Sequence, residues 1–269
     1  ECVSALVFLG VLSGRLPSAS ATIGSNAQGD TVQILPSSSI PQWREVKPLI
    51  VASSSAFFRS LTLQLSISSA AAMAARVDAP DVAPYVAAHQ IGIQLWLLCS
   101  FFCDSLAAAS QGLVADAIGR DSQADAREIS STVFWYSLGL GVFLATLLQT
   151  GYMTGIIFDL FTKDSETRTA LSQILPLIVM AQPLNALVFA ADGVLQGANE
   201  FPFQAKAMLV SGATALCTFL LLEIGGDHAE TLIHVWSALI ALQAMRGITS
   251  LVKLVDREGP IDLLTLPKR

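Results

Sequence analysis

The residues that could do chemistry in this sequence are a few acids and amides inside long apolar stretches. Asp104 lies in the run 86–115, which otherwise holds apolar and small residues, one His and three Gln. Asp192 lies in a second apolar run, after Gln182 and Asn185. A carboxylate inside a bilayer is costly unless it faces a protein interior or water. We therefore expect each acid to face polar partners in the protein or in water.

Two interpretations of these side chains stay open. Their spacing puts Gln182, Asn185 and Asp192 on one face of a helix, and Asp104 and Gln111 on one face of another. Such stripes can line a cavity that binds a cation, a proton or a polar solute, or they can hydrogen-bond neighbouring helices together. The candidate ion- or proton-binding residues are Asp192 and Asp104. The candidate polar contacts to a solute are Gln182, Asn185, Gln111 and Gln64.

Three further residues of these runs lead to separate predictions. Pro183 removes a backbone hydrogen bond in mid-helix and frees a carbonyl, and Pro176 lies seven residues earlier on the same face. They predict a bent or bendable helix, which could be a moving part or a static kink. His89 lies close to the start of its stretch and is expected at the membrane interface.

Composition sets the class of protein that must hold these groups. Of 269 residues, 53% are hydrophobic and 13% charged, about half the charged fraction of an ordinary soluble domain. No basic stripe with interleaved aromatic residues is present, so nucleic acid is not an expected partner. The four Cys and three His show no metal-ligand spacing, and no nucleophile or phosphate-binding loop is found. We therefore expect a membrane protein that is not an enzyme and has no cofactor.

Hydrophobic runs predict an all-α integral membrane fold. Six spans are expected, at about 48–75, 84–116, 129–152, 170–198, 203–222 and 231–252. A short amphipathic segment and loop are expected at 156–170, and the pair Gly151 and Gly155 could let helices approach closely. With six spans, twelve of the fifteen Lys and Arg fall on one side, Arg59 and Arg246 among them. That side is predicted to be cytoplasmic.

The chain is expected to divide at the edges of these spans. Residues 1–12 are interpreted as the end of a preceding transmembrane helix of a longer protein, and 13–47, rich in Ser, Gly and Pro, as a cytoplasmic linker. Residues 48–256 are the six-helix membrane domain. Residues 257–269 are expected to be a cytoplasmic tail, interfacial or disordered.

Several of these segments resemble one transporter family. The stretches 87–115 and 175–201 resemble the second and fourth helices of the C-terminal half of MATE (multidrug and toxic compound extrusion) transporters. The likeness is greatest to the DinF-type branch, which includes plant organic-acid exporters. FTKDSE at 161–166 is similar to a segment before the fourth helix of that half, and 57–76 is similar to the family's seventh helix.

The resemblance implies a fold and an activity. MATE transporters have twelve helices in two six-helix lobes and exchange a solute for H⁺ or Na⁺. This chain would be the C-terminal lobe, preceded by the linker between lobes, and the N-terminal lobe would be its missing partner. Asp192 matches the acidic position of the tenth helix, Gln182-Pro183-x-Asn185 the polar motif before it, and Asp104 an acid of the eighth helix.

The implied function is that of half of a secondary-active antiporter. The lobe would export a small organic solute, either an organic anion such as citrate or a xenobiotic, in exchange for H⁺ or Na⁺. The alternative is a transport-inactive structural membrane fragment that packs against a partner lobe. The plasma membrane and the plastid envelope both stay open as the location.

Overall fold

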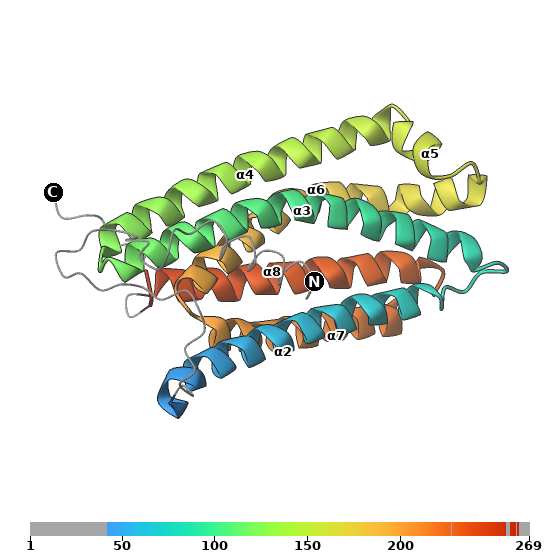
Figure 1. The fold of residues 1–269 in the computed structure, drawn as a ribbon. Coiled ribbons are helices and arrows are strands. Elements are labelled where there is room, and N and C mark those ends of the chain that lie inside the picture. Colours follow the sequence, from blue (N-terminus) through green and yellow to red (C-terminus); the bar gives the residue numbers. More distant parts are fainter. Residues whose placement is uncertain (1–41, 227, 257–258, 262, 264–269) are drawn as a thin grey trace, which may run out of the picture. The chain divides into compact units, whose positions relative to one another are not determined.

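The computed structural model describes residues 42–226, 228–256, 259–261 and 263, and the regular secondary structure in that part is helical (Figure 1). The chain divides into two compact units at Leu49, and all that follows concerns the second, apart from the first turns of α2. The helices are α2 (Trp43–Ala74), α3 (Ala83–Gly119), α4 (Gln123–Met153), α5 (Ile156–Phe161), α6 (Ser165–Gly197), α7 (Phe201–Gly225), the 3₁₀ turn η1 (His228–Glu230) and α8 (Thr231–Val255). The expected helix end at 1–12 and most of the expected linker lie outside the described residues.

Five of these helices are long and apolar enough to cross a membrane, namely α3, α4, α6, α7 and α8. The all-α membrane fold is thereby confirmed. The remaining expected span, α2, has 32 residues but is less apolar, because it is rich in Ser and carries Arg59 and Gln64. It begins at Trp43 and contains Pro48, so the expected linker boundary at residue 47 lies several residues inside the helix.

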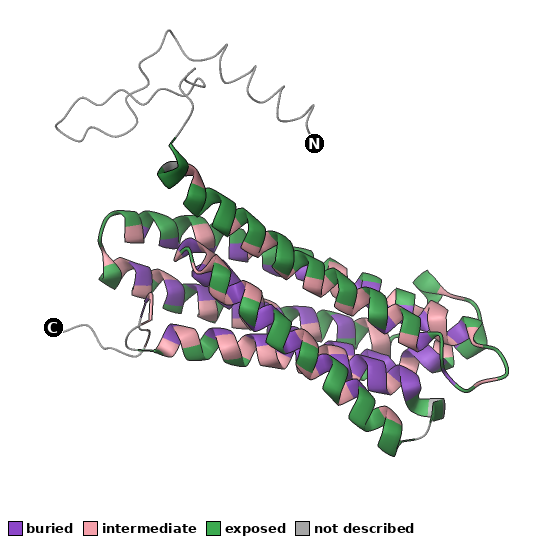
Figure 2. Cartoon of the chain, turned by 90° about the horizontal axis from the view of Figure 1, so that it is seen from below, coloured by how far each residue is buried: buried purple, intermediate pink, exposed green. Residues whose placement is uncertain are grey.

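Helix α6 is the centre of the bundle. In its most apolar 18-residue window 61% of the residues are buried, against 22–33% in the other four candidate spans. It packs against α3, α4 and α8, and the buried residues gather where these helices meet (Figure 2). A helix that is covered on most sides is expected to be apolar nearly all round, so any polar residue on it must find a partner within the protein.

Glycines bring α6 into close contact with its neighbours. A Cβ atom at Gly193 would lie 2.3 Å from the carbonyl oxygen of Ala107 in α3, and one at Gly197 would lie 2.7 Å from that of Gln111. A Cβ atom at Gly141 in α4 would lie 2.7 Å from the Cα atom of Pro183. Small residues at such spacing let helix backbones approach in lipid.

The glycine pair singled out from the sequence has another role. Gly155 has φ of +77°, in the left-handed region, and it caps the start of the short helix α5, while Gly151 faces Ile157 of that same helix. Gly151 and Gly155 therefore make the turn between α4 and α5, and the close approach that Gly151 allows is to the short helix α5. The helix-joining pair is Gly193 and Gly197.

The segment 161–166 caps α6. Asp164 accepts hydrogen bonds from the backbone N–H of Thr167 at 2.8 Å and from its hydroxyl at 2.6 Å. Those bonds stabilise the ionised form and lower the pKa of Asp164. Arg168 donates to the carbonyl of Thr162 and to Asp159. The short segment expected at 156–170 is thus a capped turn between two long helices.

Part of the expected tail folds onto the bundle. Ile261 is buried together with Leu254 of α8 and Val194 of α6, and the backbone N–H of Leu263 donates to the carbonyl of Leu254 at 3.0 Å. Apart from 259–261 and 263, residues 257–269 lie outside the described residues. A tail interpreted as interfacial or disordered therefore contains at least one core residue.

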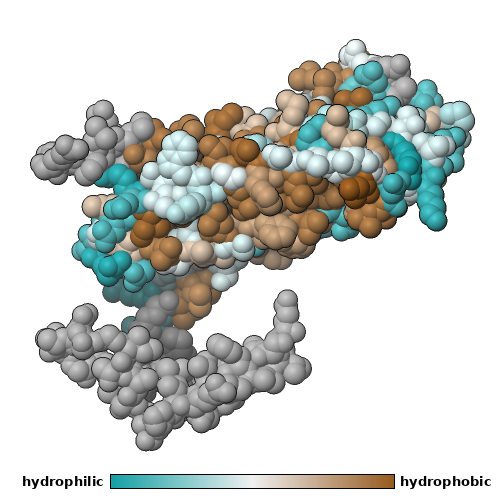
Figure 3. Space-filling view, turned by 90° about the horizontal axis from the view of Figure 1, so that it is seen from above, coloured by the Kyte–Doolittle hydropathy of each residue, from teal (hydrophilic) through white to brown (hydrophobic). Residues whose placement is uncertain are grey.

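Large apolar side chains cover the outside of the bundle. Figure 3 shows hydrophobic residues along the middle of the helices and hydrophilic ones toward their ends. Phe101, Trp135, Leu147 and Leu221 are each more than half exposed. Soluble proteins rarely expose contiguous apolar surface of this extent, whereas lipid tails match it.

Candidate functional site

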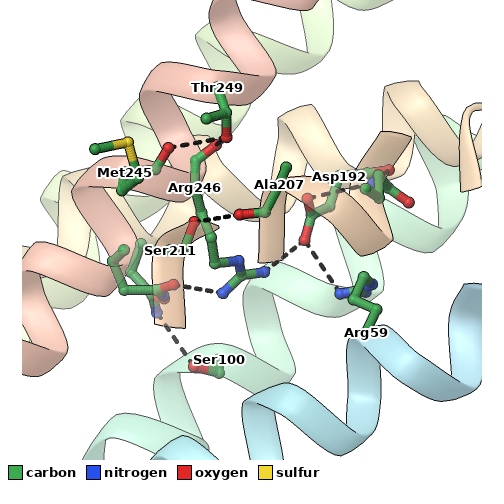
Figure 4. Close-up of polar contacts among 11 residues, drawn as sticks. Arg59, Ser100, Asp192, Ala207, Ser211, Met245, Arg246 and Thr249 are labelled. Carbon is green, nitrogen blue, oxygen red and sulfur yellow. Dashed lines mark hydrogen bonds and ion pairs between the residues drawn. The ribbon is translucent and has the colours of Figure 1, made fainter. Parts of the chain in front are cut away.

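Asp192 lies in the second half of α6, with 6% of the residue exposed, and three neighbouring helices supply its partners (Figure 4). Arg246 of α8 donates to its carboxylate from 2.5 Å, and Arg59 of α2 lies 3.4 Å from the same oxygen. Gln204 of α7 donates to the other carboxylate oxygen at 3.3 Å and to the backbone carbonyl of Asp192 at 3.0 Å. Asp192 therefore connects α6 with α2, α7 and α8.

A chain of amide hydrogen bonds continues from Arg246 into the bundle. Arg246 donates to the side-chain oxygen of Gln243, which lies three residues earlier on α8. Gln243 donates to Asn185 of α6 at 2.6 Å, and Asn185 donates to the hydroxyl of Ser100 on α3 at 3.2 Å. All of these residues are less than 9% exposed. We call this set, from Arg59 through Asp192 to Ser100, the charge network.

The charge network carries two guanidinium groups and one carboxylate. The side chains of Arg246 and Asp192 are 7% and 9% exposed, and that of Arg59 is 24% exposed. Arg246 also lies 5.9 Å from the ring centre of Phe189. Buried charges are stable only where partners and hydrogen bonds compensate the loss of hydration. Asp192 is so compensated, and the network as a whole keeps one formal positive charge.

A cavity of about 90 Å³ borders the network on the side of Arg246. Its polar lining consists of Arg246, Gln243 and Ser100, and its other walls are apolar and aromatic, with Trp96 and Trp236 among them. A much smaller space of about 10 Å³, large enough for about one water, lies between Arg59, Asp192, Gln204 and Arg246. Arg246 alone among the charged residues borders both.

The structure brings together part of the set predicted from sequence. Asp192 and Asn185 are both members of the charge network. Gln182 is fully buried on the same helix, but it donates to the carbonyl of Ile178 one turn earlier, and its side-chain oxygen has no hydrogen-bond partner in the part of the chain that the structure describes. Pro183 lies beside it, and α6 is continuous through Pro176 and Pro183.

The other candidates lie elsewhere. Asp104 is exposed on α3 next to Phe101 and Phe102, Gln64 is exposed on α2, and Gln111 is partly exposed. None of these three joins the charge network or borders the cavity at Arg246. Within the described residues, Asp104, Gln111 and Gln64 therefore lie apart from the contacts of Asp192, and a role for them in solute or ion binding stays a prediction.

Sequence reasoning missed the positive half of the network. Neither Arg59 nor Arg246 was assigned to the site, although the cost of burying a charge applies to arginine as it does to aspartate. Gln243 and Gln204, which bind the charged groups, were not singled out. The signal was available, because Gln243 and Arg246 are three residues apart in an apolar helix and therefore share a face.

His89 was also placed wrongly. It is fully buried, 5.8 Å from Trp236 between ring centres, and neither ring nitrogen has a hydrogen-bond partner among the described residues. Gly92 lies against the same tryptophan, so the side chain of Trp236 packs tightly on α3 there. His89 is a core residue and not an interfacial one.

Within the described part of the chain no three His, Cys, Asp or Glu side chains are arranged to hold a metal ion.

Comparison with known proteins identifies what kind of membrane bundle this is. The MatE family model matches residues 56–221, which is more than half of the chain. The chain belongs to the MATE family. MATE proteins are transporters and not enzymes, and this chain is a multi-pass membrane protein.

Curated relatives come from Arabidopsis thaliana. The chain is 30% identical to Protein DETOXIFICATION 42 over 207 residues, covering 77% of the chain and 38% of that relative. It is 29% identical to Protein DETOXIFICATION 45, chloroplastic, over 75% of the chain and 34% of the relative, and 33% identical to Protein DETOXIFICATION 44, chloroplastic, over 66% and 33%. The chain thus spans about a third of the length of the relatives it matches. No solved structure matches it significantly.

Proposed function

We propose that this MATE chain is the C-terminal lobe of a secondary-active antiporter that exports an organic solute, either an organic anion such as citrate or a xenobiotic, in exchange for H⁺ or Na⁺. The observation that carries the proposal is the charge network. An aspartate buried in a membrane bundle, with charged or amide partners on three other helices, is a costly arrangement that serves more than packing.

Asp192 is the proposed ion-responsive group. A proton or a Na⁺ on its carboxylate would weaken its attraction to Arg246 and Arg59, because the guanidinium groups would then face a neutral partner. Those contacts join α6 to α8 and α2. An ion that binds one arrangement of the helices better than another shifts the population between them, which is what exchange requires.

We propose that α6 bends at Pro183. Proline leaves the carbonyl one turn earlier without its backbone donor, so the helix is easier to bend there. The tight approach of Gly141 in α4 to the Cα atom of Pro183 supports a defined packing on that side. Gln182 and Asn185, on either side of Pro183, are the proposed polar contacts that change with the bend.

The N-terminal six-helix lobe is the proposed partner. Asp104, Gln111 and Gln64 have exposed or partly exposed positions, and we propose that they act only once that lobe is present. The linker and the C-terminus would face the cytoplasm or its organellar equivalent, as the distribution of Lys and Arg predicts. The membrane would be the plasma membrane or the plastid envelope; two of the relatives are named chloroplastic.

The test is export by the complete transporter that carries this lobe, reconstituted in vesicles with an imposed H⁺ or Na⁺ gradient. Asp192→Asn should abolish or strongly reduce ion-driven efflux, while Asp116→Asn, at an exposed acid that pairs with Arg120 near the end of α3, serves as the matched substitution. Efflux with normal ion dependence in the Asp192→Asn protein would overturn the role of Asp192. Vesicles that are inert with the unaltered protein would favour the alternative, a structural fragment that packs against a partner lobe.

A further inference from the structure

Arg246 has two different surroundings. On one side its guanidinium binds Asp192, and on the other it borders the cavity of about 90 Å³. A guanidinium has five N–H donors, which can bind a carboxylate through two parallel hydrogen bonds. In the structure, one terminal nitrogen donates to Asp192 and the other to Gln243, a neutral amide.

The charge of the network is not balanced from within. Arg59 and Arg246 share one carboxylate, and Arg59 is the more distant partner at 3.4 Å. In a medium of low dielectric constant an excess positive charge attracts an anion strongly. A second carboxylate beside Arg246 would bring the formal charge of the network to zero.

The cavity walls determine what kind of anion fits. Trp96, Trp236 and Phe189 supply aromatic surface, and among the described residues Gln243 and Ser100 are the polar side chains that line the cavity with Arg246. A ligand with several carboxylates would leave all but one of them against apolar walls without a partner, which is costly. A cavity of about 90 Å³ holds only a few waters, so the apolar part of the ligand must be short.

We propose that this cavity binds a small monocarboxylate, with the carboxylate on Arg246 and the apolar part against Trp96 and Trp236. The proposal rests on the proposed function and deepens it by naming the class of solute for the same site. Asp192 competes with the solute for Arg246. Its carboxylate binds the guanidinium when the cavity is empty, and it keeps Arg59 and Gln204 as partners when the solute binds Arg246.

Tryptophan fluorescence measures this binding directly in the full chain in detergent. Trp43 and Trp135 are exposed, so the double variant Trp43→Phe and Trp135→Phe leaves only the two cavity tryptophans as reporters. Butyrate is the probe, butyramide its neutral isostere and citrate the polycarboxylate. We expect a saturable change with butyrate and little change with the other two. An equal response to butyramide, or tighter binding of citrate, would overturn the proposal.

Two variants test the roles of the charged residues. Arg246→Gln should abolish the butyrate response, whereas Arg120→Gln, at an exposed arginine, should leave it unchanged. Asp192→Asn removes the competing anion and should tighten butyrate binding by about tenfold. Weaker or unchanged affinity in the Asp192→Asn protein would show that Asp192 is not the competitor. Circular dichroism of each variant separates lost binding from lost fold.

This experiment is independent of the transport assay. Equilibrium binding needs no gradient and no second lobe, so an inert vesicle preparation does not affect it. Butyrate binding without ion-driven export would support the site and contradict the antiporter proposal. Ion-driven export without any fluorescence response to butyrate would contradict the monocarboxylate site alone.

Discussion

Asp192 and Asp104 are two acids in apolar helices of one bundle, and the structure gives them opposite surroundings. Asp192 is buried and binds Arg246, Arg59 and Gln204. Asp104 is exposed on α3 between large apolar side chains. Hydropathy treats the two alike, but only Asp192 lies on a helix covered by its neighbours. An acid in a membrane helix thus gains partners according to the number of helices that surround it.

Among the tests of this contrast between Asp192 and Asp104, removing Arg246 should change the free energy of unfolding the most. Arg246→Met leaves Asp192 buried with the more distant Arg59 as its charged partner and Gln204 as its amide partner. The free energy of unfolding should therefore fall by about 3 kcal/mol, the lower end for breaking a buried pair. Arg120→Met, at an exposed pair with Asp116, is the matched control and should change it by less than about 1 kcal/mol. Denaturant unfolding in detergent measures both. Equal small losses would mean that Asp192 is not held as described.

The second-largest effect is expected from a comparison of two glycine variants, one where α6 contacts α3 and one on an open face of α3. Gly193→Ala puts a methyl group 2.3 Å from the carbonyl oxygen of Ala107, so α3 and α6 must separate, at a cost of roughly 1–3 kcal/mol. Gly112→Ala on α3 meets nothing within 4 Å and should be neutral or stabilising. Thermal unfolding midpoints of the two variants check this. A stable Gly193→Ala protein would contradict the close contact that places Asp192.

Asp104→Asn should change the stability of this chain by no more than about 0.5 kcal/mol, because the exposed carboxylate loses no internal partner. The same substitution should matter only when another lobe covers that face of α3. Comparing unfolding midpoints of the chain alone and of the complete transporter tests this. A loss of more than about 1 kcal/mol in the chain alone would reveal a partner within it.

The smallest effect belongs to a third acid, Asp164, whose partner is one turn away. Because hydrogen bonds from Thr167 lower its pKa in the folded state, its contribution is fully present above about pH 3.9, the usual value for Asp. It is lost as the pH falls through the lowered pKa. Hydrogen exchange at the Thr167 amide should therefore accelerate in acid. Asp164→Asn keeps a capping oxygen that does not titrate, and its exchange should show no such step.

Prediction from sequence succeeded where a property repeats along the chain. The helices at 84–116, 129–152, 170–198, 203–222 and 231–252 follow from long apolar runs, and the structure has a helix at each, with boundaries a few residues away. The stripe of Asp192 and Asn185 on a helix face was likewise readable from spacing alone. These features depend on one helix at a time, which is why the sequence is sufficient for them.

Features that depend on two helices at once were predicted poorly. Arg246 and Arg59 are 187 positions apart, and nothing local shows that both face Asp192. His89 near a helix start is as compatible with the interface as with the core, and packing on Trp236 decides between them. Gly151 and Gly155 have the same spacing as Gly193 and Gly197, yet only the second pair packs against another long helix, α3.

The sequence by itself determined the membrane class, the helical fold and the acidic stripe of α6, because hydrophobicity and a 3.6-residue period are properties of a single segment. Only the tertiary structure decided which charges meet. A bilayer makes every buried charge seek a partner, but which partner it finds depends on how the helices pack. That packing turns Asp192 into part of a network with Arg246 and Arg59 and leaves Asp104 outside it.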